Sequence, residues 1–191
     1  MVYARKLLSG VVAGLVVVAT ALPAVAAGSG PLNTPLDSFT DGTIGRYLWT
    51  VPGVIKKNGF ITEFMCTNLD AAGSVANIGV EIFDNTGTQL NNINSPPPAG
   101  GCNGAILSVP AGSTVTISNG ATVQFHEDCI MGIAAFDNGS ARIVSTSSKI
   151  VCNALVADSK NVVVNSSGVT TGVSPSVSSL RMIKRGKQLG D

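Results

Sequence analysis

The sequence predicts an all-β fold: an antiparallel β-sandwich, immunoglobulin-like, of about eight short strands, with a small barrel as the alternative. Three observations support this prediction. Valine, isoleucine, threonine, serine and asparagine recur along a chain that has 22 glycines and only 5% aromatic residues. Apolar side chains alternate with other side chains over residues 75–84, which is the period of a strand. Turn signals recur about every ten residues, and no segment has the apolar period of a helix.

The N-terminal 26 residues have the three parts of a secretory signal peptide. The basic residues Arg5 and Lys6 precede an apolar and uncharged run over 7–22, and Ala24-Val25-Ala26 offers the small residues that a signal peptidase recognises. A retained transmembrane anchor is the alternative, because the apolar run approaches the length of a span. The proline and the small residues that follow the run favour cleavage. We therefore expect a secreted or periplasmic protein, with association to the cell surface as a further option.

Cleavage after residue 26 leaves 165 of the 191 residues, which is the size of one domain. We expect an extended arm at 27–45, a single β-sandwich at 46–183 and a polar tail at 184–191. Two of the twelve basic residues belong to the signal peptide, so ten remain against eleven acidic residues. This near-neutral balance gives no footprint for nucleic acid. It favours weakly an assembled or surface-bound state, a homo-oligomer included.

The first two strands are expected at 46–55 and 60–69. Pro52 marks a bend or a sheet edge in the first strand, because proline cannot donate a hydrogen bond to a central ladder. Trp49 is the only tryptophan and the candidate core anchor. A turn at 56–59, with Asn58-Gly59 at the bend, joins the two strands. One face of the second strand is expected to point into the core: Phe60, Thr62, Phe64 and Cys66.

The middle of the chain contains three further strands and a long loop. The strand at 75–84 has Ile78, Val80 and Ile82 on one side. Residues 89–104 contain three consecutive prolines, so they cannot form a central strand, and a disulfide at Cys102 would anchor them. Two short strands flank a turn, and another turn leads into a short segment: 105–109, 114–118 and 121–125.

The clearest hairpin signal lies at Asp137-Asn138-Gly139-Ser140, between two apolar runs. Asn-Gly suits a two-residue type I′ turn, which needs positive φ at both central residues. In that register Ala141 and Ile143 face one way and Arg142 the other. Further along, the apolar residues occupy even positions: Ile150, Cys152, Ala154 and Val156. Because the side-chain period of a strand is two, we expect a bulge or a strand break within 145–148. Short strands at 162–164 and 180–183 would follow.

Four cysteines lie in the exported part: Cys66, Cys102, Cys129 and Cys152. An even number in an oxidising compartment predicts two disulfides, and the absence of a C-x-x-C pair disfavours zinc. The hairpin register sets Cys129 and Cys152 four positions apart, which is too far for a bond. Two connectivities remain: Cys66–Cys152 with Cys102–Cys129, or Cys66–Cys129 with Cys102–Cys152. We prefer the first, because Cys66 and Cys152 both lie in mid-strand on core faces.

No group of residues predicts catalysis, a cofactor or a metal. His126-Glu127-Asp128-Cys129 collects four potential ligands, but neighbouring side chains of a strand point to opposite faces, so at most two converge. No G-x-S-x-G motif accompanies the single histidine. A glycosidase-like carboxylate pair among Glu63, Glu81, Glu127 and the aspartates stays open, although aromatic residues are scarce. A basic cluster near the C-terminus is interpreted as a solvated tail or as a contact with an anionic surface: Arg181, Lys184, Arg185 and Lys187.

We therefore expect a non-catalytic β-sandwich, stapled by disulfides, that acts outside the cytoplasm as a binding or structural module. Its partner would be a protein or a polysaccharide at the cell surface. The alternative is a self-assembling subunit of a surface fibre or coat. In that case the arm at 27–41, or the tail from Val177, would add as a strand to the open sheet edge of a neighbour.

Overall fold

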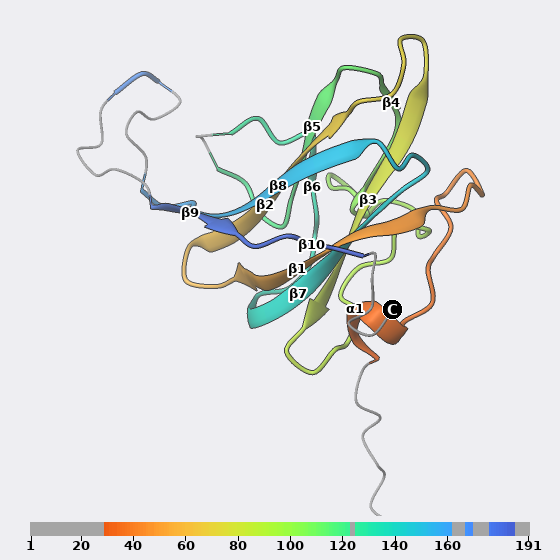
Figure 1. Ribbon diagram of the computed structural model, residues 1–191. Coiled ribbons are helices and arrows are strands. Elements are labelled where there is room, and N and C mark those ends of the chain that lie inside the picture. The colour runs from red at the N-terminus through yellow and green to blue at the C-terminus, as the bar shows by residue number, and fades with distance from the viewer. Residues whose placement is uncertain (1–28, 123–124, 162–166, 170–175, 186–191) are drawn as a thin grey trace, which may run out of the picture.

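The computed structural model describes residues 29–122, 125–161, 167–169 and 176–185. These residues form two five-stranded sheets that pack as a β-sandwich and do not close into a barrel (Figure 1). The all-β prediction is confirmed, with ten strands in place of about eight and one helix of a single turn. The elements are α1 (Gly30–Asn33), β1 (Arg46–Lys56), β2 (Phe60–Asn68), β3 (Val75–Asp84), β4 (Ala105–Pro110), β5 (Thr114–Ser118), β6 (Cys129–Ile130), β7 (Phe136–Ser145), β8 (Ile150–Asp158), β9 (Val177–Leu180) and β10 (Ile183–Lys184).

The strand order is β10-β1-β7-β3-β4 in sheet I and β6-β5-β2-β8-β9 in sheet II. All strand pairs are antiparallel except β5 with β6. Among the described strands, the chain changes sheets six times: between β1 and β2, β2 and β3, β4 and β5, β6 and β7, β7 and β8, and β9 and β10. Each change brings an apolar face of one sheet against the other, so the core forms between the two layers.

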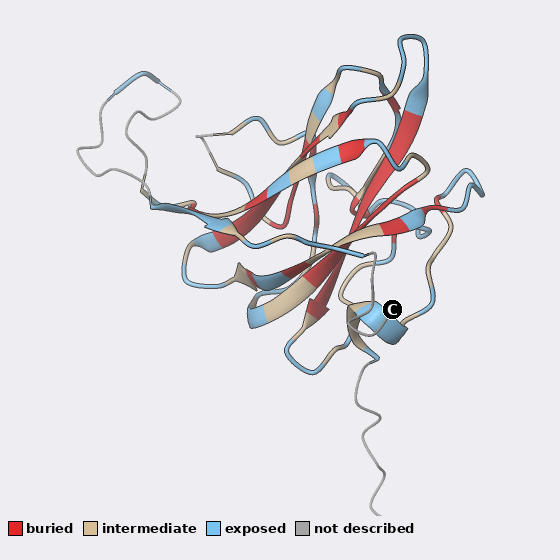
Figure 2. Cartoon of the chain, viewed as in Figure 1, coloured by how far each residue is buried: buried red, intermediate tan, exposed pale blue. Residues whose placement is uncertain are grey.

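Buried residues gather in the middle of the strands, and the turns at the ends are mostly exposed (Figure 2). Ile78, Val80 and Ile82 of β3 are fully buried, as their alternation predicts. Phe64 of β2 belongs to the same core cluster. Phe60 was expected on that face but is 40% exposed, because it flanks the β1–β2 turn at the end of its strand. The prediction for Trp49 is also wrong, since this residue is half-buried at the side of the core, where β1 meets the short β10.

The β1–β2 connection is the type of turn that Asn-Gly favours. Asn58 and Gly59 both have positive φ, 57° and 90°, and they form the two-residue loop. Lys57 and Phe60 exchange both backbone hydrogen bonds, each 2.9 Å long. Asn tolerates this conformation better than most residues, and Gly adopts it without strain. The predicted turn at 56–59 is therefore confirmed.

The hairpin predicted at Asn138-Gly139 does not exist, because β7 runs straight through this dipeptide. Gly139 pairs with Val54 of β1 on one side and with Asp84 of β3 on the other. It does not adopt the positive φ of a type I′ turn. A Cβ atom at this position would collide with the carbonyl oxygen of Phe83, so glycine is needed for the close approach of two backbones. Of the expected preceding strand, only the two-residue β6 forms.

The predicted break between residues 145 and 148 is confirmed. The strand β7 ends at Ser145 and β8 begins at Ile150. The apolar residues change from odd to even positions because β7 belongs to sheet I and β8 to sheet II. Ala141 and Ile143 are fully buried, and Ile150 and Ala154 meet them from the opposite layer.

One disulfide joins two strands of sheet II, and the other joins the long loop to this sheet. Cys66 of β2 bonds to Cys152, its direct partner on β8, and Cys102 in the long loop bonds to Cys129 of β6. This is the pairing preferred from the sequence. The argument that separated Cys129 from Cys152 was nevertheless wrong, because it used the hairpin that does not form. These two cysteines are kept apart by β5 and β2, which lie between β6 and β8.

The C-terminal segment supplies an edge strand to each sheet. The strand β9 pairs with β8, and β10 pairs with β1, with Arg181 and Met182 between them. The expected single strand at 180–183 is thus two strands, because the segment passes from one sheet to the other. The expected strand at 162–164 and most of the tail at 184–191 lie outside the described residues.

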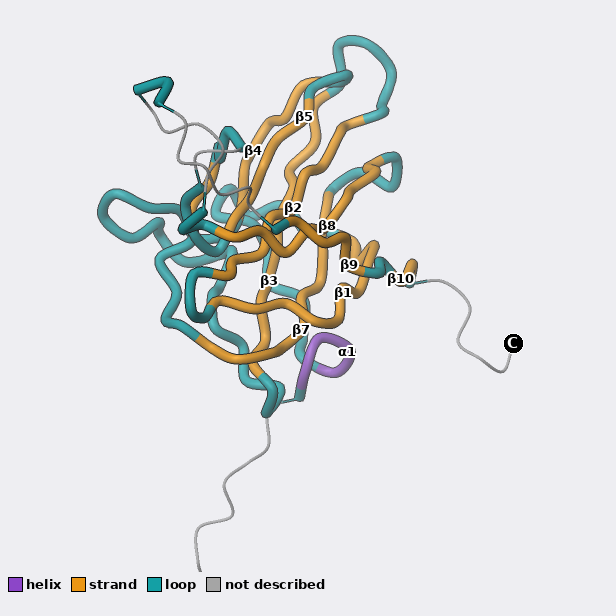
Figure 3. The backbone as a smooth tube through the Cα atoms, turned by 90° about the vertical axis from the view of Figure 1, so that its left-hand side faces the viewer, coloured by secondary structure: helices purple, strands orange, loops and turns teal. Residues whose placement is uncertain are grey.

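The described part of the arm folds back on its own sandwich. The helix α1 lies beside β7 and β3 (Figure 3), and Phe39 is fully buried with Ile93 and Val144 on the outer face of sheet I. The predicted signal peptide lies outside the described residues. Within the part of the chain that is described, no helix has the length and hydropathy needed to span a bilayer.

Candidate functional site

A groove of about 540 Å³ opens at the β1–β2 turn. Three segments that are distant in the sequence form its walls: the turn itself, the residues after β5 and the residues after β6. Apolar residues and glycines dominate the lining, and Phe60 and Ile130 are 40% and 38% exposed. The lining comprises Lys56, Lys57, Asn58, Gly59, Phe60, Ile61, Gly120, Ala121, Ile130, Met131, Gly132, Ala135 and Ser159.

Two lysines on β1 and its turn give the groove positive charge. The Nζ atom of Lys56 donates a hydrogen bond of 2.7 Å to the carbonyl oxygen of Ile133, which ties β1 to the opposite wall. Burial lowers the pKa of Lys56. Lys57 forms an ion pair with Asp137 at the surface. Ser159 is the one hydroxyl residue of the lining, and it donates to the carbonyl oxygen of Gly59.

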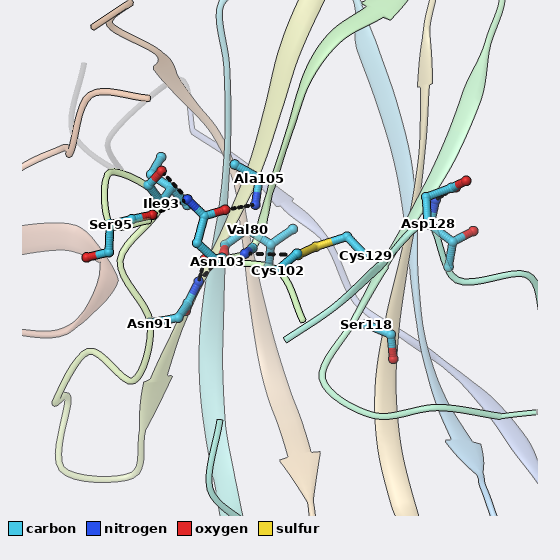
Figure 4. Close-up of a disulfide and its surroundings, with 12 residues drawn as sticks. Val80, Asn91, Ile93, Ser95, Cys102, Asn103, Ala105, Ser118, Asp128 and Cys129 are labelled. Carbon is cyan, nitrogen blue, oxygen red and sulfur yellow. Dashed lines mark hydrogen bonds between the residues drawn. A yellow bond between two sulfur atoms is a disulfide. The ribbon is translucent and has the colours of Figure 1, made fainter. Parts of the chain in front are cut away.

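The Cys102–Cys129 disulfide and two asparagines hold the long loop beside this wall (Figure 4). Asn103 Nδ2 donates to the carbonyl oxygens of Ile93 and Ser95, each at 2.7 Å. Asn91 bonds through its side chain to the backbone of β3, at Val80 and Ile82. The backbone N–H of Cys102 donates to Ile130. The sequence pointed to Cys102 as the anchor of the loop. It did not point to Asn91 and Asn103, because asparagine is also a common turn residue and the sequence does not separate the two roles.

The predicted cluster 126–129 does not converge on one point. His126 is exposed, and its Nε2 lies 3.5 Å from Asp128 Oδ1. Asp128 Oδ2 accepts a hydrogen bond from the backbone of Thr116. Glu127 Oε1 accepts from the N–H and the hydroxyl of Thr122. Cys129 is in its disulfide. The interpretation as a polar segment at the rim of the sheet agrees with these positions.

Glu127 instead faces a glutamate on β2. Glu63 is fully buried on β2, where its strand partners are Ser118 on β5 and Leu155 on β8. Among the described residues, no donor meets either carboxyl oxygen in full hydrogen-bond geometry, although the hydroxyl of Ser118 lies close enough to oppose the rise of the pKa of Glu63. Burial, and then the charge of Glu127, raise the pKa of Glu63 to about 8. The sequence named both residues as carboxylates, but it had no signal that they meet.

A second buried glutamate lies on the outer face of sheet I, and it has a cation. Glu81 of β3 accepts a hydrogen bond from Nε of Arg142 on β7. The guanidinium also donates to the carbonyl oxygens of Thr34 and Pro35 in the arm. Gln89 Nε2 donates to Glu81 at 3.1 Å and to Asp37 at 3.1 Å. Burial raises the pKa of Glu81, and the hydrogen bond from Arg142 opposes that shift.

The predicted basic cluster is partly used for packing. The Nζ atom of Lys184 lies 5.8 Å from the ring centroid of Trp49, and the guanidinium of Arg185 lies 4.7 Å from that of Tyr47. Both contacts fix the last described residues against β1. Lys187 lies outside the described residues.

The groove thus offers apolar contact and two amines, and its lining holds no hydroxyl or thiol nucleophile with a neighbouring base. Across the described ranges, no three acidic, histidine or cysteine side chains come together as a metal-binding group. No protein-family model, no curated protein and no solved structure was found to match this chain.

Proposed function

We propose that this protein is a non-catalytic binding module that works outside the cytoplasm and holds a protein partner in the groove beside the β1–β2 turn. The observation that carries the proposal is the groove itself: its walls are apolar, partly exposed and joined by backbone hydrogen bonds. The partner would present an apolar segment to Phe60 and Ile130, with an acidic group near the lysines.

The residues around the groove are held in place by bonds within the protein, which favours binding to a preformed surface. Its turn is a tight two-residue loop, Lys56 links two of its walls, and Cys102–Cys129 lies behind the third. A surface that is already ordered loses little conformational freedom when it binds. A protein fits better than a polysaccharide, because Phe60 is the only aromatic residue of the lining and sugars need stacking faces and many hydrogen bonds.

The two disulfides support the proposed location. Such bonds persist in oxidising compartments, and the sequence predicts export through an N-terminal signal peptide. Together they favour a secreted or periplasmic protein, and an apolar groove on such a protein is suited to a surface partner.

Site-specific photo-crosslinking in the exporting cell tests this proposal. A benzoylphenylalanine at Phe60 should form one discrete adduct with a protein when the intact cells are illuminated. The matched control places the same group at Val75, which is 59% exposed and lies outside the groove. No adduct at position 60, or the same adducts at both positions, would reject the groove as a binding site.

Exchange of the C-terminal segment between copies is the second candidate, because residues 176–185 complete the edges of both sheets. Their side chains bury little, apart from Leu180 and Met182. The arm is less suited to exchange, since Arg142 holds its carbonyl groups. A chain that ends at residue 175 should bind a peptide of residues 176–191 added to it, and the full chain should form oligomers at high concentration. A monomer at every concentration, with no uptake of the peptide, would eliminate exchange.

A further inference from the structure

The chain contains four Asn-Gly dipeptides, at residues 58–59, 103–104, 119–120 and 138–139, and all four lie in the part that the structure describes. In such a pair the backbone nitrogen of glycine can attack the side-chain amide of asparagine, because glycine has no Cβ to hinder the approach. The attack needs an amide that is not held elsewhere and a peptide bond that can turn toward it. The fold gives the four pairs very different surroundings.

Two of the asparagines are held by their amides. Asn103 is 7% exposed, and its amide makes three hydrogen bonds with the backbone. Asn119 is fully buried, and its amide bonds to the backbone of β1 and β2. The backbone nitrogen of the following glycine is engaged in both pairs, because it donates to a sulfur or hydroxyl two residues earlier. Neither pair is therefore free to react.

The third asparagine, Asn138, has an exposed side chain but a fixed backbone. Gly139 pairs with Val54 on one side and with Asp84 on the other. An extended strand keeps ψ at about 135°, which points the nitrogen of Gly139 away from the side chain of Asn138. Attack would require β7 to separate from both of its neighbours.

The fourth asparagine, Asn58, lies exposed at the tip of the β1–β2 turn. Among the described residues, neither its amide nor the N–H of Gly59 has a hydrogen-bond partner. Closure of a ring through Cβ and Cγ needs ψ of about −120° at the asparagine, which is the value of the first central residue in a type II′ turn. A flip of the peptide between Asn58 and Gly59 converts the type I′ turn to type II′ and keeps both bonds between Lys57 and Phe60. Glycine permits the flip because it accepts either sign of φ.

We propose that Asn58 is a self-modification site, at which the protein converts its own asparagine to aspartate and isoaspartate with water as the co-reactant. The deprotonated backbone nitrogen of Gly59 attacks Cγ of Asn58 and forms the N–Cγ bond. The side-chain nitrogen takes up protons from solvent and leaves as ammonia, so that a succinimide ring remains. Water then opens the ring: cleavage of the N–Cγ bond gives aspartate, and cleavage of the bond between the nitrogen and the main-chain carbonyl carbon gives isoaspartate.

Both products place a carboxylate on the rim of the groove, because Asn58 lines it together with Lys56 and Lys57. The new charge opposes that of the two lysines and weakens the attraction for an acidic group of the partner. Isoaspartate also adds a methylene to the main chain, which displaces Lys57 from its register with Phe60. The effect on binding rests on the function proposed above, whereas the covalent change does not.

Peptide mapping of the aged chain tests the modification without any mutation. The full exported chain, with its disulfides intact, is incubated in H₂¹⁸O near pH 8. The peptide that contains Asn58 should lose ammonia and gain one ¹⁸O, in two isomeric forms, at a rate that rises in proportion to hydroxide because the nitrogen of Gly59 must lose its proton. Peptides that contain Asn103, Asn119 or Asn138 should change at least about a hundredfold more slowly, since each needs local unfolding.

The same chain in urea is the control, and all four asparagines should then change at similar rates. Similar rates at all four sites of the folded chain would overturn the proposal, because the sequence alone would then decide reactivity. An Asn58 that stays unchanged, or an Asn138 that changes faster than Asn58, would overturn it as well.

Photo-crosslinking from position 60 tests the effect on binding separately. Asn58→Asp supplies the normally linked product, and Asp-Gly keeps the type of turn. The yield of the protein adduct should fall about two- to fivefold, which is the effect of one exposed charge. The control Asn85→Asp adds the same charge at an exposed turn outside the groove and should leave the yield unchanged. Equal yields in all three chains would refute the effect on binding. An absence of adduct in all of them would reject the groove, while ¹⁸O uptake at Asn58 still decides the modification.

Discussion

Glu63 and Glu81 are two fully buried glutamates, one in each sheet, on the faces that point away from the shared core. Glu81 lies beneath the arm, whose carbonyl groups bind Arg142, and Glu63 lies between Ser118 of β5 and Leu155 of β8. Their partners differ. Glu81 meets the guanidinium of Arg142 and the amide of Gln89, whereas Glu63 meets the carboxyl group of Glu127.

The difference shows that burial by itself does not define the state of a carboxyl group. Burial raises the pKa of both glutamates. Arg142 opposes this shift at Glu81 by its charge and its hydrogen bond, whereas at Glu63 the hydroxyl of Ser118 is, among the described residues, the sole group that opposes it and Glu127 adds to it. An ion pair fixes the arm at every moderate pH, because a guanidinium does not lose its proton. The two buried carboxyl groups therefore differ in how they make the free energy of unfolding depend on pH.

Removal of Arg142 should have the largest effect, because it breaks the ion pair and the anchor of the arm together. Arg142→Met leaves Glu81 buried without its cation and frees the carbonyl groups of Thr34 and Pro35. We expect a loss of about 3–5 kcal/mol in the free energy of unfolding, measured with urea on the oxidised chain at pH 7.

Two further variants make that measurement specific. Arg46→Met removes an exposed arginine of β1 and should change stability by less than about 0.5 kcal/mol. The double variant Glu81→Met with Arg142→Met should recover part of the loss, since no charge is then left buried. A single variant as stable as the unmodified chain would mean that the arm does not depend on Arg142.

Substitution by glutamine at the two glutamates should change the free energy of unfolding in opposite directions at pH 9. Glu81→Gln leaves Arg142 without its carboxylate and should cost about 2–3 kcal/mol. Glu63→Gln removes a group that the fold disfavours in its charged form, so it should stabilise the protein by about 1–3 kcal/mol. Urea unfolding of both variants in parallel measures the two values, and effects of equal sign would remove the contrast.

The free energy of unfolding of the unmodified chain, measured as a function of pH, also reports the raised pKa of Glu63. Between pH 4.5 and about 8 the folded state holds a proton at Glu63 that the unfolded state has lost. The free energy of unfolding should therefore fall as the pH rises through this window, by up to about 1.4 kcal/mol per unit from this group. Above pH 8 this contribution becomes constant. In Glu63→Gln it should be absent.

The strands were predictable because they depend on local patterns, but the role of a turn dipeptide was not. Asn58-Gly59 and Asn138-Gly139 look alike in the sequence, with apolar residues on both sides. The first forms a type I′ turn, and the second lies inside β7 between two neighbouring strands. Glycine is needed in both places, first for its φ and then for its missing Cβ. Only the arrangement of β1, β3 and β7 separates the two uses.

The candidate site was predictable only in its parts. Alternation placed Arg142 and Glu63 on faces that point away from the core, which is correct. The same alternation predicts that both faces are exposed to solvent, because no local pattern indicates that residues distant in the sequence bury them. The covering contacts join residues far apart in the sequence, such as Thr34 with Arg142 and Glu63 with Glu127. The disulfide pairing was obtained from mid-strand positions, although one step of that argument used a hairpin that is not there.

Gln89 allows the smallest and most specific test, because its amide separates two carboxylates under the arm. Its Nε2 donates to Asp37 and to Glu81, and Gln89→Met removes both bonds while keeping the bulk of the side chain. We expect a loss of about 1–2 kcal/mol at pH 8 and a smaller loss at pH 4.5, where a proton between the carboxyl groups can replace the amide. Asn138→Met, at an exposed amide of β7, is the matched control and should be close to neutral. If the loss were the same at both pH values, the amide would act by packing alone, and Arg142 would be sufficient to keep Glu81 ionised.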